Sequence, residues 1–507
     1  MTTNNNSPWK RPFVEVVDQR REKLPPAWLA TNKTSALRNE RGRDVHESGR
    51  ERVAANAVIT LLQQAAEKVV VSSFLLADKG IEDTLLATAK RGVRVYVLLA
   101  SEARLGKEES EGEFDKKVLE LHKEMLTRLG GHVLFRSAPH FHAKVVVVDP
   151  ETCPAGMLLT ANLTTEALER NEELAIVLTG EEVAEATAYA KWAMWESAEH
   201  ELVDPKDRFK AVKPLGKLPH PGPSSALVAT TPKATTICDE ALRLIDDARS
   251  RIVVSSFGWD VGHEVVRRLA ERARDGVDVT VLARMRPSSM PALLALAEAG
   301  AKVVGFKWLH AKAIWTDSKQ AMVMSANLQA DGMDHGFEFG VRLSGSRADE
   351  VLARLTRWAE GAEWRLAAAP TLGDVNGKVM LWQRGQLIDG EVRPIVDVDL
   401  GTLTASSAHE LIVERPATPN VGPIPRLAHE LRCTWTVAAP LLAAKAKEVR
   451  RPIDGEEKPV SYTPPVFREP GDRLVVAVRS RDELEPARAL MSEVKAAAIV
   501  LAERAAQ

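Results

Sequence analysis

With 507 residues the chain has room for about three domains of ~150 residues each. The apolar share of 45% and the charged share of 27% are typical of a folded globular protein and exclude a disordered or fibrous chain. The formal net charge of −2 gives the whole chain no attraction to nucleic acid or to an anionic membrane, but it does not exclude a positive cleft on one face.

The cysteines and the apolar runs limit where the protein works. Cys153, Cys238 and Cys433 are far apart and odd in number, so their spacing predicts neither a disulfide framework nor a metal-ligand cluster. The first residues are polar and lack an apolar stretch of signal-peptide length, and no run of about 20 apolar residues occurs. We therefore expect a cytoplasmic protein without a membrane span.

The chain begins irregularly and then becomes periodic. Residues 1–50 are polar with mixed charge, and we expect an N-terminal tail, with or without a short helix, wrapped on the domain that follows. Residues 51–204 form a first lobe of alternating helices and strands. Its first elements are a helix over 53–66, a strand over 69–74, a helix over 81–91 and a strand over 93–99.

The same order of elements returns after a linker. Six prolines mark residues 205–235 as that linker, although a strand over 226–229 is compatible with it. The second lobe, 236–370, lacks an acidic helical insertion that the first carries over 107–117. Strands alternating with helices predict an α/β fold of two lobes, each with a mixed and mostly parallel sheet. The repeated elements are a strand over 252–257, a helix over 264–274 and a strand over 277–282.

After about residue 370 the repeat stops. Apolar segments separated by Gly and Pro turns predict strands over 378–384, 409–413 and 473–478, and a final helix is expected over 484–505. Residues 371–507 are therefore expected to form a β-rich accessory domain with a C-terminal helix. This region carries no chemical motif.

One short pattern of polar residues occurs twice, once in each lobe. A lone His-x-Lys means little, but two copies followed by matched Asp, Asn and Glu indicate one duplicated active-site unit. The first copy is His142, Lys144, Asp149, Asn162 and Glu173, and the second is His310, Lys312, Asp317, Asn327 and Glu338.

The spacing of these residues suggests their roles. Side chains alternate along a strand, so His and Lys two positions apart share a face, whereas Asp149 and Asp317 point away and are expected to be structural. Thr160 and Ser325, with the two Asn, could donate to phosphate oxygens, and each Glu could accept a hydrogen bond from a His ring. Two sets around one phosphorus would supply a nucleophile and a general acid, with Lys neutralising phosphate charge.

Over residues 51–370 the chain resembles the phospholipase D superfamily, whose signature is HxKx4D, a Gly-Ser/Thr-x-Asn turn and a downstream Glu. The resemblance implies two halves that meet around one active site and catalysis through a phosphohistidine, without a metal or other cofactor. It also implies that His142 is the nucleophile and His310 the general acid, with Lys144, Lys312, Asn162 and Asn327 binding phosphate and Glu173 and Glu338 orienting the rings. The chain departs from the signature where Leu159 and Met324 replace the turn Gly.

Several residues near these motifs have two interpretations. His140 could contact substrate, but Trp308 occupies the equivalent position in the second copy. Trp308 and Trp315 could stack on a base, although core packing explains them as well. Four serines after equivalent strands either reach the cleft or cap the chain: Ser72, Ser73, Ser255 and Ser256.

We expect a metal-independent phosphodiesterase that cleaves nucleic acid, such as a defence or DNA-repair nuclease, working with a separate ATPase or recognition subunit. The choice of nucleic acid rests on the lack of the membrane helices and signal peptides that accompany lipid-acting relatives. The first alternative is a soluble phospholipase or transphosphatidylase. The second is a non-catalytic nucleic-acid-binding module, which predicts damage to one His-Lys set, whereas both are complete.

Overall fold

The computed structural model divides into two compact units, one of residues 31–366 and one of residues 1–30 with 367–507. Each unit is described by itself. The residues that the structure describes are 23–33, 41–101, 105, 116–202, 209–222, 226–399, 404–413, 429–434, 447–453, 456–462, 466–469 and 473–478.

The first lobe is built on a nine-stranded mixed sheet with the order β12-β11-β6-β5-β3-β7-β8-β10-β2. Strands β3, β5 and β6 run parallel, and the other neighbours pair antiparallel. The strands are β2 (Val45–Glu47), β3 (Lys68–Ser72), β5 (Arg94–Ala100), β6 (Leu134–Ala138), β7 (Val145–Val148), β8 (Ala155–Leu159), β10 (Leu174–Val177), β11 (His200–Leu202) and β12 (Lys210–Ala211). The helices are α1 (Val53–Gln64), α2 (Lys79–Lys90), α4 (Lys116–Leu129), α5 (Thr165–Glu169) and α6 (Gly180–Trp192).

The second lobe repeats this design. Its strands follow the order β14-β13-β20-β19-β18-β15-β16-β17-β21, and β15, β16 and β17 are again the parallel set. The strands are β13 (Leu227–Thr231), β14 (Ala234–Thr235), β15 (Arg251–Ser256), β16 (Asp278–Arg284), β17 (Lys302–Phe306), β18 (Ala313–Thr316), β19 (Gln320–Met324), β20 (Glu338–Ser344) and β21 (Trp364–Ala367). The helices are α7 (Thr236–Asp247), α8 (Glu264–Arg274), α9 (Met290–Glu298) and α10 (Gly345–Gly361).

The duplicated α/β fold is confirmed, but the parallel part of each sheet is smaller than predicted. The strand that follows each His-x-Lys pairs antiparallel with its neighbours, β7 with β3 and β8, and β18 with β15 and β19. Short loops connect β7 to β8 and β18 to β19, and a short connection returns the chain antiparallel, whereas β3 and β15 lie far from β7 and β18 along the chain. The sheets are therefore mixed, with a parallel set of three strands at the centre.

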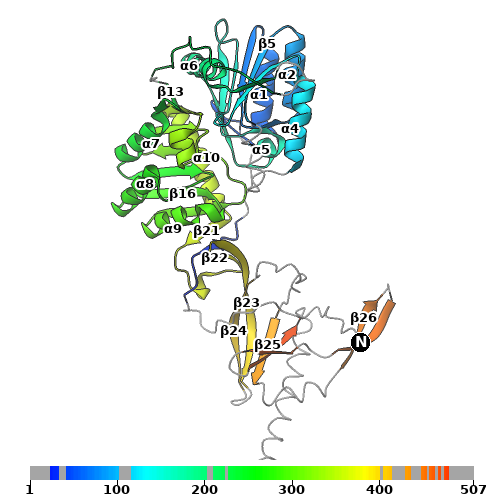
Figure 1. Ribbon diagram of the computed structural model, residues 1–507. Coiled ribbons are helices and arrows are strands. Elements are labelled where there is room, and N and C mark those ends of the chain that lie inside the picture. The colour runs from blue at the N-terminus through cyan, green and yellow to red at the C-terminus, as the bar shows by residue number, and fades with distance from the viewer. Residues whose placement is uncertain are drawn as a thin grey trace, which may run out of the picture. The chain divides into compact units, whose positions relative to one another are not determined.

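Alternation along the strands divides the apolar side chains between two cores. In β7, Val146 and Val148 pack with α1 and α2, whereas Val145 and Val147 face a core that contains residues of both lobes. Helices α6 and α10 contribute to this shared core, and Arg347 at the start of α10 forms an ion pair with Glu182 of α6. In Figure 1, α7, α8 and α9 lie side by side on the face of the second sheet away from α10. The shared core fixes the two lobes against each other.

Two predicted boundaries differ from the structure. The segment predicted as an N-terminal tail contains two strands. Strand β2 pairs with β10 of the first lobe, whereas β1 (Ala27–Ala30) belongs to the unit of residues 1–30 and 367–507 and pairs there with β22 (Lys378–Gln383). Within 23–33 and 41–50 the structure has strands and no helix. In the segment predicted as a linker, β13 pairs with β20 and is fully buried. Pairing with a distant strand is not visible in local composition, which explains both differences.

The other unit is rich in strands where the structure describes it. Its core contains apolar residues of β1, β22 and the segment between 367 and 375. Its further strands are β23 (Gln386–Asp399), β24 (Thr404–Val413), β25 (His429–Thr434), β26 (Lys447–Ile453), β27 (Glu456–Tyr462), β28 (Val466–Glu469) and β29 (Arg473–Val478). The helix predicted over 484–505 lies outside the described residues, as does most of the insertion predicted over 107–117.

Candidate active site

The two His-x-Lys segments are joined to each other's lobes through the backbone. The amides of His142 and Ala143 donate to the carbonyl of Phe337, over 3.1 and 2.7 Å. The amides of His310 and Ala311 donate in the same way to the carbonyl of Glu172, over 3.1 and 2.9 Å. Each motif therefore lies beside the residue that precedes the Glu of the opposite lobe.

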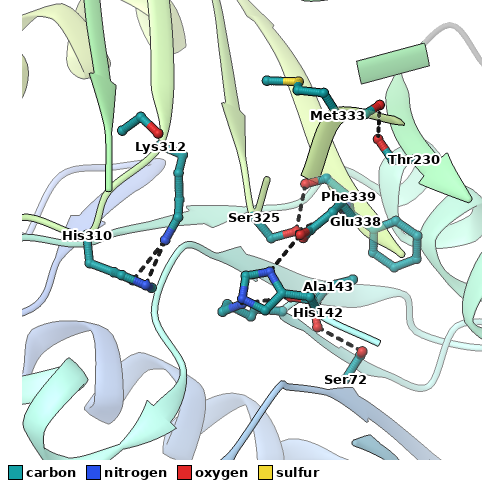
Figure 2. Close-up of polar contacts among 12 residues, drawn as sticks. Ser72, His142, Ala143, Thr230, His310, Lys312, Ser325, Met333, Glu338 and Phe339 are labelled. Atoms are coloured by element: carbon teal, nitrogen blue, oxygen red, sulfur yellow. Dashed lines mark hydrogen bonds and ion pairs between the residues drawn. The ribbon is translucent and has the colours of Figure 1, made fainter. Parts of the chain in front are cut away.

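The two glutamates consequently exchange partners between the lobes. Nδ1 of His142 lies 2.6 Å from Oε1 of Glu338, and Nδ1 of His310 lies 2.7 Å from Oε1 of Glu173. An ionised carboxylate can only accept, so each Nδ1 carries the proton and donates it, which leaves the lone pair on Nε2. Figure 2 shows the His142 ring directed at the second-lobe carboxylate. Neither lobe alone has a complete site.

Thr160 and Ser325 hold these carboxylates in place. The Thr160 hydroxyl donates to Oε2 of Glu173 over 2.5 Å, and the Ser325 hydroxyl donates to Oε2 of Glu338. Both hydroxyl side chains are fully buried. The buried carboxylates take up these hydroxyl hydrogens, so the structure shows the two hydroxyls orienting glutamates, and phosphate binding by them stays a prediction.

Both motif lysines are fully buried and lie against the histidine rings. Nζ of Lys144 is 3.0 Å from Nε2 of His142 and donates to its carbonyl oxygen over 2.7 Å. Nζ of Lys312 is 2.9 Å from Nδ1 and 3.0 Å from Nε2 of His310 (Figure 2). Burial and the charge of Lys144 lower the pKa of Lys312, although two carboxylates oppose the shift.

The site holds its histidines neutral. Burial, together with the neighbouring lysines, lowers the pKa of His142 to about 4 and that of His310 to about 3, against the opposing effect of the carboxylates. Burial alone would raise the pKa of Glu173 and Glu338, but the adjacent His and Lys keep both below the usual value. At neutral pH each ring is thus a neutral imidazole with its lone pair on Nε2, next to a lysine ammonium, and this is the form that can attack phosphorus once the lysine turns to the substrate.

One pocket of about 530 Å³ receives both rings and both motif asparagines. The side chain of His142 is 24% exposed and that of His310 is 12% exposed, so neither ring is sealed in apolar interior. Oδ1 of Asn162 and Oδ1 of Asn327 are buried and have no hydrogen-bond partner among the described residues. Both asparagines line the pocket, where only their amide nitrogens can donate to the oxygens of a bound phosphate.

The comparisons with known proteins agree with this geometry. The family model described as "Cardiolipin synthase, PLD-like domain" matches residues 58–195 and 241–361, which together are half of the chain. The chain belongs to the phospholipase D superfamily. The matched segments begin after β2 and β13, so the model covers most of each lobe. No curated protein matches the chain.

Three solved structures resemble parts of this superfamily member. Phosphatidylserine synthase of Haemophilus influenzae Rd KW20 is 11% identical, covering 69% of this chain and 91% of that one, with a TM-score of 0.48. Polyphosphate kinase of Porphyromonas gingivalis is 14% identical, with a TM-score of 0.41, and this chain, 59% covered, spans 44% of its length. Nuc of Salmonella typhimurium is 19% identical, covering 28% of this chain and 97% of that one, with a TM-score of 0.25. Nothing about substrate follows from similarities this low.

The remaining motif residues, Asp149 and Asp317, bind backbone amides and do not line the pocket. The Asp149 carboxylate accepts from the amides of Ala66, Glu67 and Lys68 over 2.7 to 2.8 Å. Asp317 does the same for the amides of Arg249 and Ser250. Both aspartates therefore hold the loop before the first parallel strand, as their position on the strand suggested.

The four serines also act on the backbone. Ser72 donates to the carbonyl of Ala143 and Ser255 to that of Ala311, each over 2.8 Å (Figure 2 for Ser72). The neighbouring serines, Ser73 and Ser256, bridge two loops through one donated and one accepted bond. Of the two interpretations, the structure favours the cap over the cleft.

The aromatic and basic residues near the pocket are either buried in the shared core or accessible at the pocket. Trp315 is buried in the shared core, while Trp308 is half-buried and carries the guanidinium of Arg170 at 3.9 Å from its ring. His140 is exposed at the pocket. Sequence reasoning missed Phe74 and Phe257, whose rings lie edge-on to His142 and His310. Their signal was present, because Ser-Ser-Phe is repeated at both positions.

A separate group of side chains has the composition of a metal site. Ligand atoms of Cys238, His263 and Asp334 lie within 4.8 Å of one another. However, Nδ1 of His263 accepts from the amide of Val265 at the start of α8, so Nε2 carries the proton and faces Asp334 at 3.3 Å. A cation at Nε2 would have to displace that proton. The group is better explained as a helix cap, and we assign no metal site within the described residues.

No helix in the described part of the chain has the length and apolar character needed to cross a membrane.

Proposed function

We propose that the two lobes form one phosphodiesterase site that works through a phosphohistidine. The observation that carries this proposal is the pair of neutral histidines lining one pocket, each oriented by a glutamate of the opposite lobe. A duplicated pair has a chemical purpose, since phosphoryl transfer needs both a nucleophile and a proton donor on opposite sides of one phosphorus.

In the first step Nε2 of His142 attacks the phosphorus and the bond to the leaving oxygen breaks. That oxygen takes a proton from Nε2 of His310. His310 must first be protonated, and the negative charge of the bound phosphate favours its imidazolium form. The ammonium groups of Lys144 and Lys312, which lie 3.0 Å from Nε2 of the rings, then donate to the non-bridging oxygens, as do the amides of Asn162 and Asn327.

In the second step His310 is neutral and accepts a proton from water. The resulting hydroxide attacks the phosphorus and the bond to His142 breaks, which restores the enzyme. Glu338 keeps its hydrogen bond to Nδ1 of His142 throughout and so stabilises the positive phosphohistidine ring.

For the substrate, nucleic acid is the first candidate. The pocket is lined by Arg170, Arg284, Arg286, His140 and His335. Three large apolar side chains are exposed in the described residues, Leu121, Leu215 and Val261, and none of them lines the pocket. The lining also includes the carboxylates of Glu166, Asp331 and Glu338, so it is strongly polar, and a polar wall that carries three arginines suits a polyanion better than an acyl chain. We keep in this proposal the expectation of a defence or repair role beside a separate ATPase or recognition subunit.

The second candidate is exchange or hydrolysis of a phospholipid headgroup. The observation that favours it is the description of the matching family model, which names cardiolipin synthase. A lipid substrate has the same scissile phosphodiester, so the histidine chemistry is common to both candidates.

The test is turnover in EDTA of bis(4-nitrophenyl) phosphate, single-stranded DNA, duplex DNA, RNA, and vesicles of phosphatidylcholine with phosphatidylglycerol. We expect hydrolysis of the model diester and of at least one nucleic acid. Turnover of vesicles without nucleic-acid cleavage would assign the second candidate. No turnover of any ester would contradict both.

A further inference from the structure

A group of cations and aromatic rings lies beside His310, most of it from the second lobe and one member, Arg170, from the first. The guanidinium of Arg284 lies 5.1 Å from the ring centre of Phe257 and 5.3 Å from that of Trp308. Arg170 lies over the same Trp308 ring at 3.9 Å. Phe257 in turn packs against the His310 imidazole, with 4.8 Å between ring centres. Arg284 is thus one aromatic ring away from the proposed general acid.

Arg284 and Arg170 form no hydrogen bond or ion pair through their side chains in the described part of the chain, although both line the pocket and Arg284 is half-buried. Arg284 is repelled by Arg170 and is attracted, from beyond ion-pair distance, by Glu173 and Glu172. A carboxyl close to them, Glu172, is buried with Oε2 unpaired, and burial raises its pKa to about 7. Two unpaired guanidinium groups that repel each other would be stabilised by an anion between them.

The second-lobe part of this group is not duplicated, unlike the catalytic residues. Arg170 comes from the first lobe, and its counterpart, counted from Glu173 and Glu338, is His335, which also lines the pocket. Pairing of β3 with β5 and of β15 with β16 makes Ala100 the counterpart of Arg284. Counted from the motif histidines, His140 is the counterpart of Trp308 and Pro139 that of Lys307. The chemistry at phosphorus needs matched groups on both sides, so cations present on one side serve another part of the substrate.

We propose that Arg284 and Arg170, supported by Trp308 and Phe257, bind a second phosphate of the substrate on the leaving-group side of the scissile one. This inference rests on the proposed function, which supplies the scissile phosphate. Guanidinium groups bind phosphate through paired hydrogen bonds, and the aromatic rings beneath them hold their planes in position. A nucleic-acid strand presents such a flanking phosphate at every step, whereas phosphatidylcholine has one phosphate.

The experiment measures binding by calorimetry of thymidine 3′,5′-bisphosphate, thymidine 5′-monophosphate and thymidine 3′-monophosphate, none of which is a diester. The readout is the ratio of the tighter monophosphate Kd to the bisphosphate Kd, in the native chain and in Arg284→Met. We expect the native ratio to exceed about ten and to fall by about tenfold or more in the variant, the value of one charge-assisted contact. Arg284→Lys should recover part of the ratio, because it restores the charge but not the fork.

The matched control is Arg267→Met, which removes one exposed positive charge from α8 of the same lobe. It should keep the native ratio. A native ratio near one, or an equal fall in Arg267→Met, would overturn the subsite, since the effect would be absent or due to net charge. An unchanged ratio in Arg284→Met, with monophosphate still bound, would overturn it as well.

The failure of the proposed function has a different signature. In that case the native chain hydrolyses neither bis(4-nitrophenyl) phosphate nor any natural diester, yet an Arg284-dependent preference for bisphosphate would still support a two-phosphate site. Hydrolysis of the model diester together with a ratio that ignores Arg284 would leave the enzyme standing and remove the subsite.

Discussion

The first and second lobes place equivalent His, Lys, Asn and Glu side chains around one pocket, yet the walls that they add to it differ. The second lobe supplies Arg284 to the lining, with Trp308 against it, where the first lobe has Ala100 and His140 at the equivalent positions. The matched groups act on the two sides of one phosphorus, where the nucleophile attacks and the leaving group departs. The unmatched groups make the two sides of the pocket different, and we infer that they determine the orientation of a bound substrate.

The comparison also shows why one lobe alone could not form the site. Each lobe positions its own histidine on the backbone but orients the ring of the other lobe through Glu173 or Glu338. The lobes therefore depend on each other for chemistry as well as for the shared hydrophobic core.

The strongest way to break the comparison is to remove one histidine. His142→Ala and His310→Ala are each expected to reduce kcat by at least about a thousandfold, because neither half has a spare nucleophile or acid. The measurement is steady-state hydrolysis of a diester with an alkoxide leaving group. Activity within tenfold of native in either variant would refute the two-histidine scheme.

A second change tests the exchange of glutamates. Glu338→Gln should reduce kcat by about a hundredfold, since an amide no longer fixes the Nδ1–H tautomer of His142 or stabilises its charged form. Nitrogen NMR of the imidazoles should report a changed tautomer for His142 and little change for His310. Glu173→Gln is the matched control and should affect His310 instead. A perturbation of the ring in the same lobe as the mutated Glu would contradict the crossed arrangement.

A smaller effect distinguishes the buried hydroxyls from phosphate ligands. Thr160→Val and Ser325→Ala are each expected to lower kcat about tenfold through a misplaced carboxylate, while KM and the affinity for inorganic phosphate stay near native. Asn162→Ala supplies the contrast, because loss of a phosphate contact should weaken phosphate binding. If Thr160→Val weakened phosphate as much as Asn162→Ala, the hydroxyl would have to reach the substrate.

The smallest expected effect is the uptake of a proton when phosphate binds. Without a bound anion both imidazoles are neutral at pH 7, since the pKa of His142 lies at about 4 and that of His310 at about 3. A bound phosphate favours the imidazolium form and raises these values, so binding should take up as much as about one proton at pH 7, and less below pH 4, where the free rings are already protonated. Calorimetry in buffers of different ionisation enthalpy measures this uptake, and His310→Ala should reduce it. Zero proton uptake at pH 7 in the native chain would show that phosphate binding does not protonate His310.

The sequence was sufficient to predict the repeat, the meeting of the two motif histidines at one pocket and the backbone contacts of Asp149 and Asp317, because these follow from spacing and strand parity. It was insufficient for the partners of the glutamates. The residues before Glu173 and Glu338 cross to the opposite lobe through bonds of Glu172 and Phe337, and such distant pairing leaves no local pattern. The bonds of Thr160 and Ser325 to the Glu of their own lobe were also not predicted, because strand parity does not show which buried acceptor a hydroxyl reaches.

The cationic wall could not be found from the sequence for another reason. Arg170 and Arg284 are single residues at the end of a helix and of a strand, without a spacing that separates them from the other surface arginines. Their significance comes from what surrounds them, and that appears only when the two lobes are assembled.

The central claim, that phosphorus is transferred to a histidine of this pocket, is tested most directly by trapping the intermediate. The His310→Ala variant, given a diester with a 4-nitrophenyl leaving group, should release nitrophenol once. Phosphorus should then remain bound to the ring nitrogen of His142 as an acid-labile, alkali-stable phosphohistidine, identified by mass spectrometry. A native chain that turns over while no variant ever carries phosphorus on His142 or His310 would contradict the account.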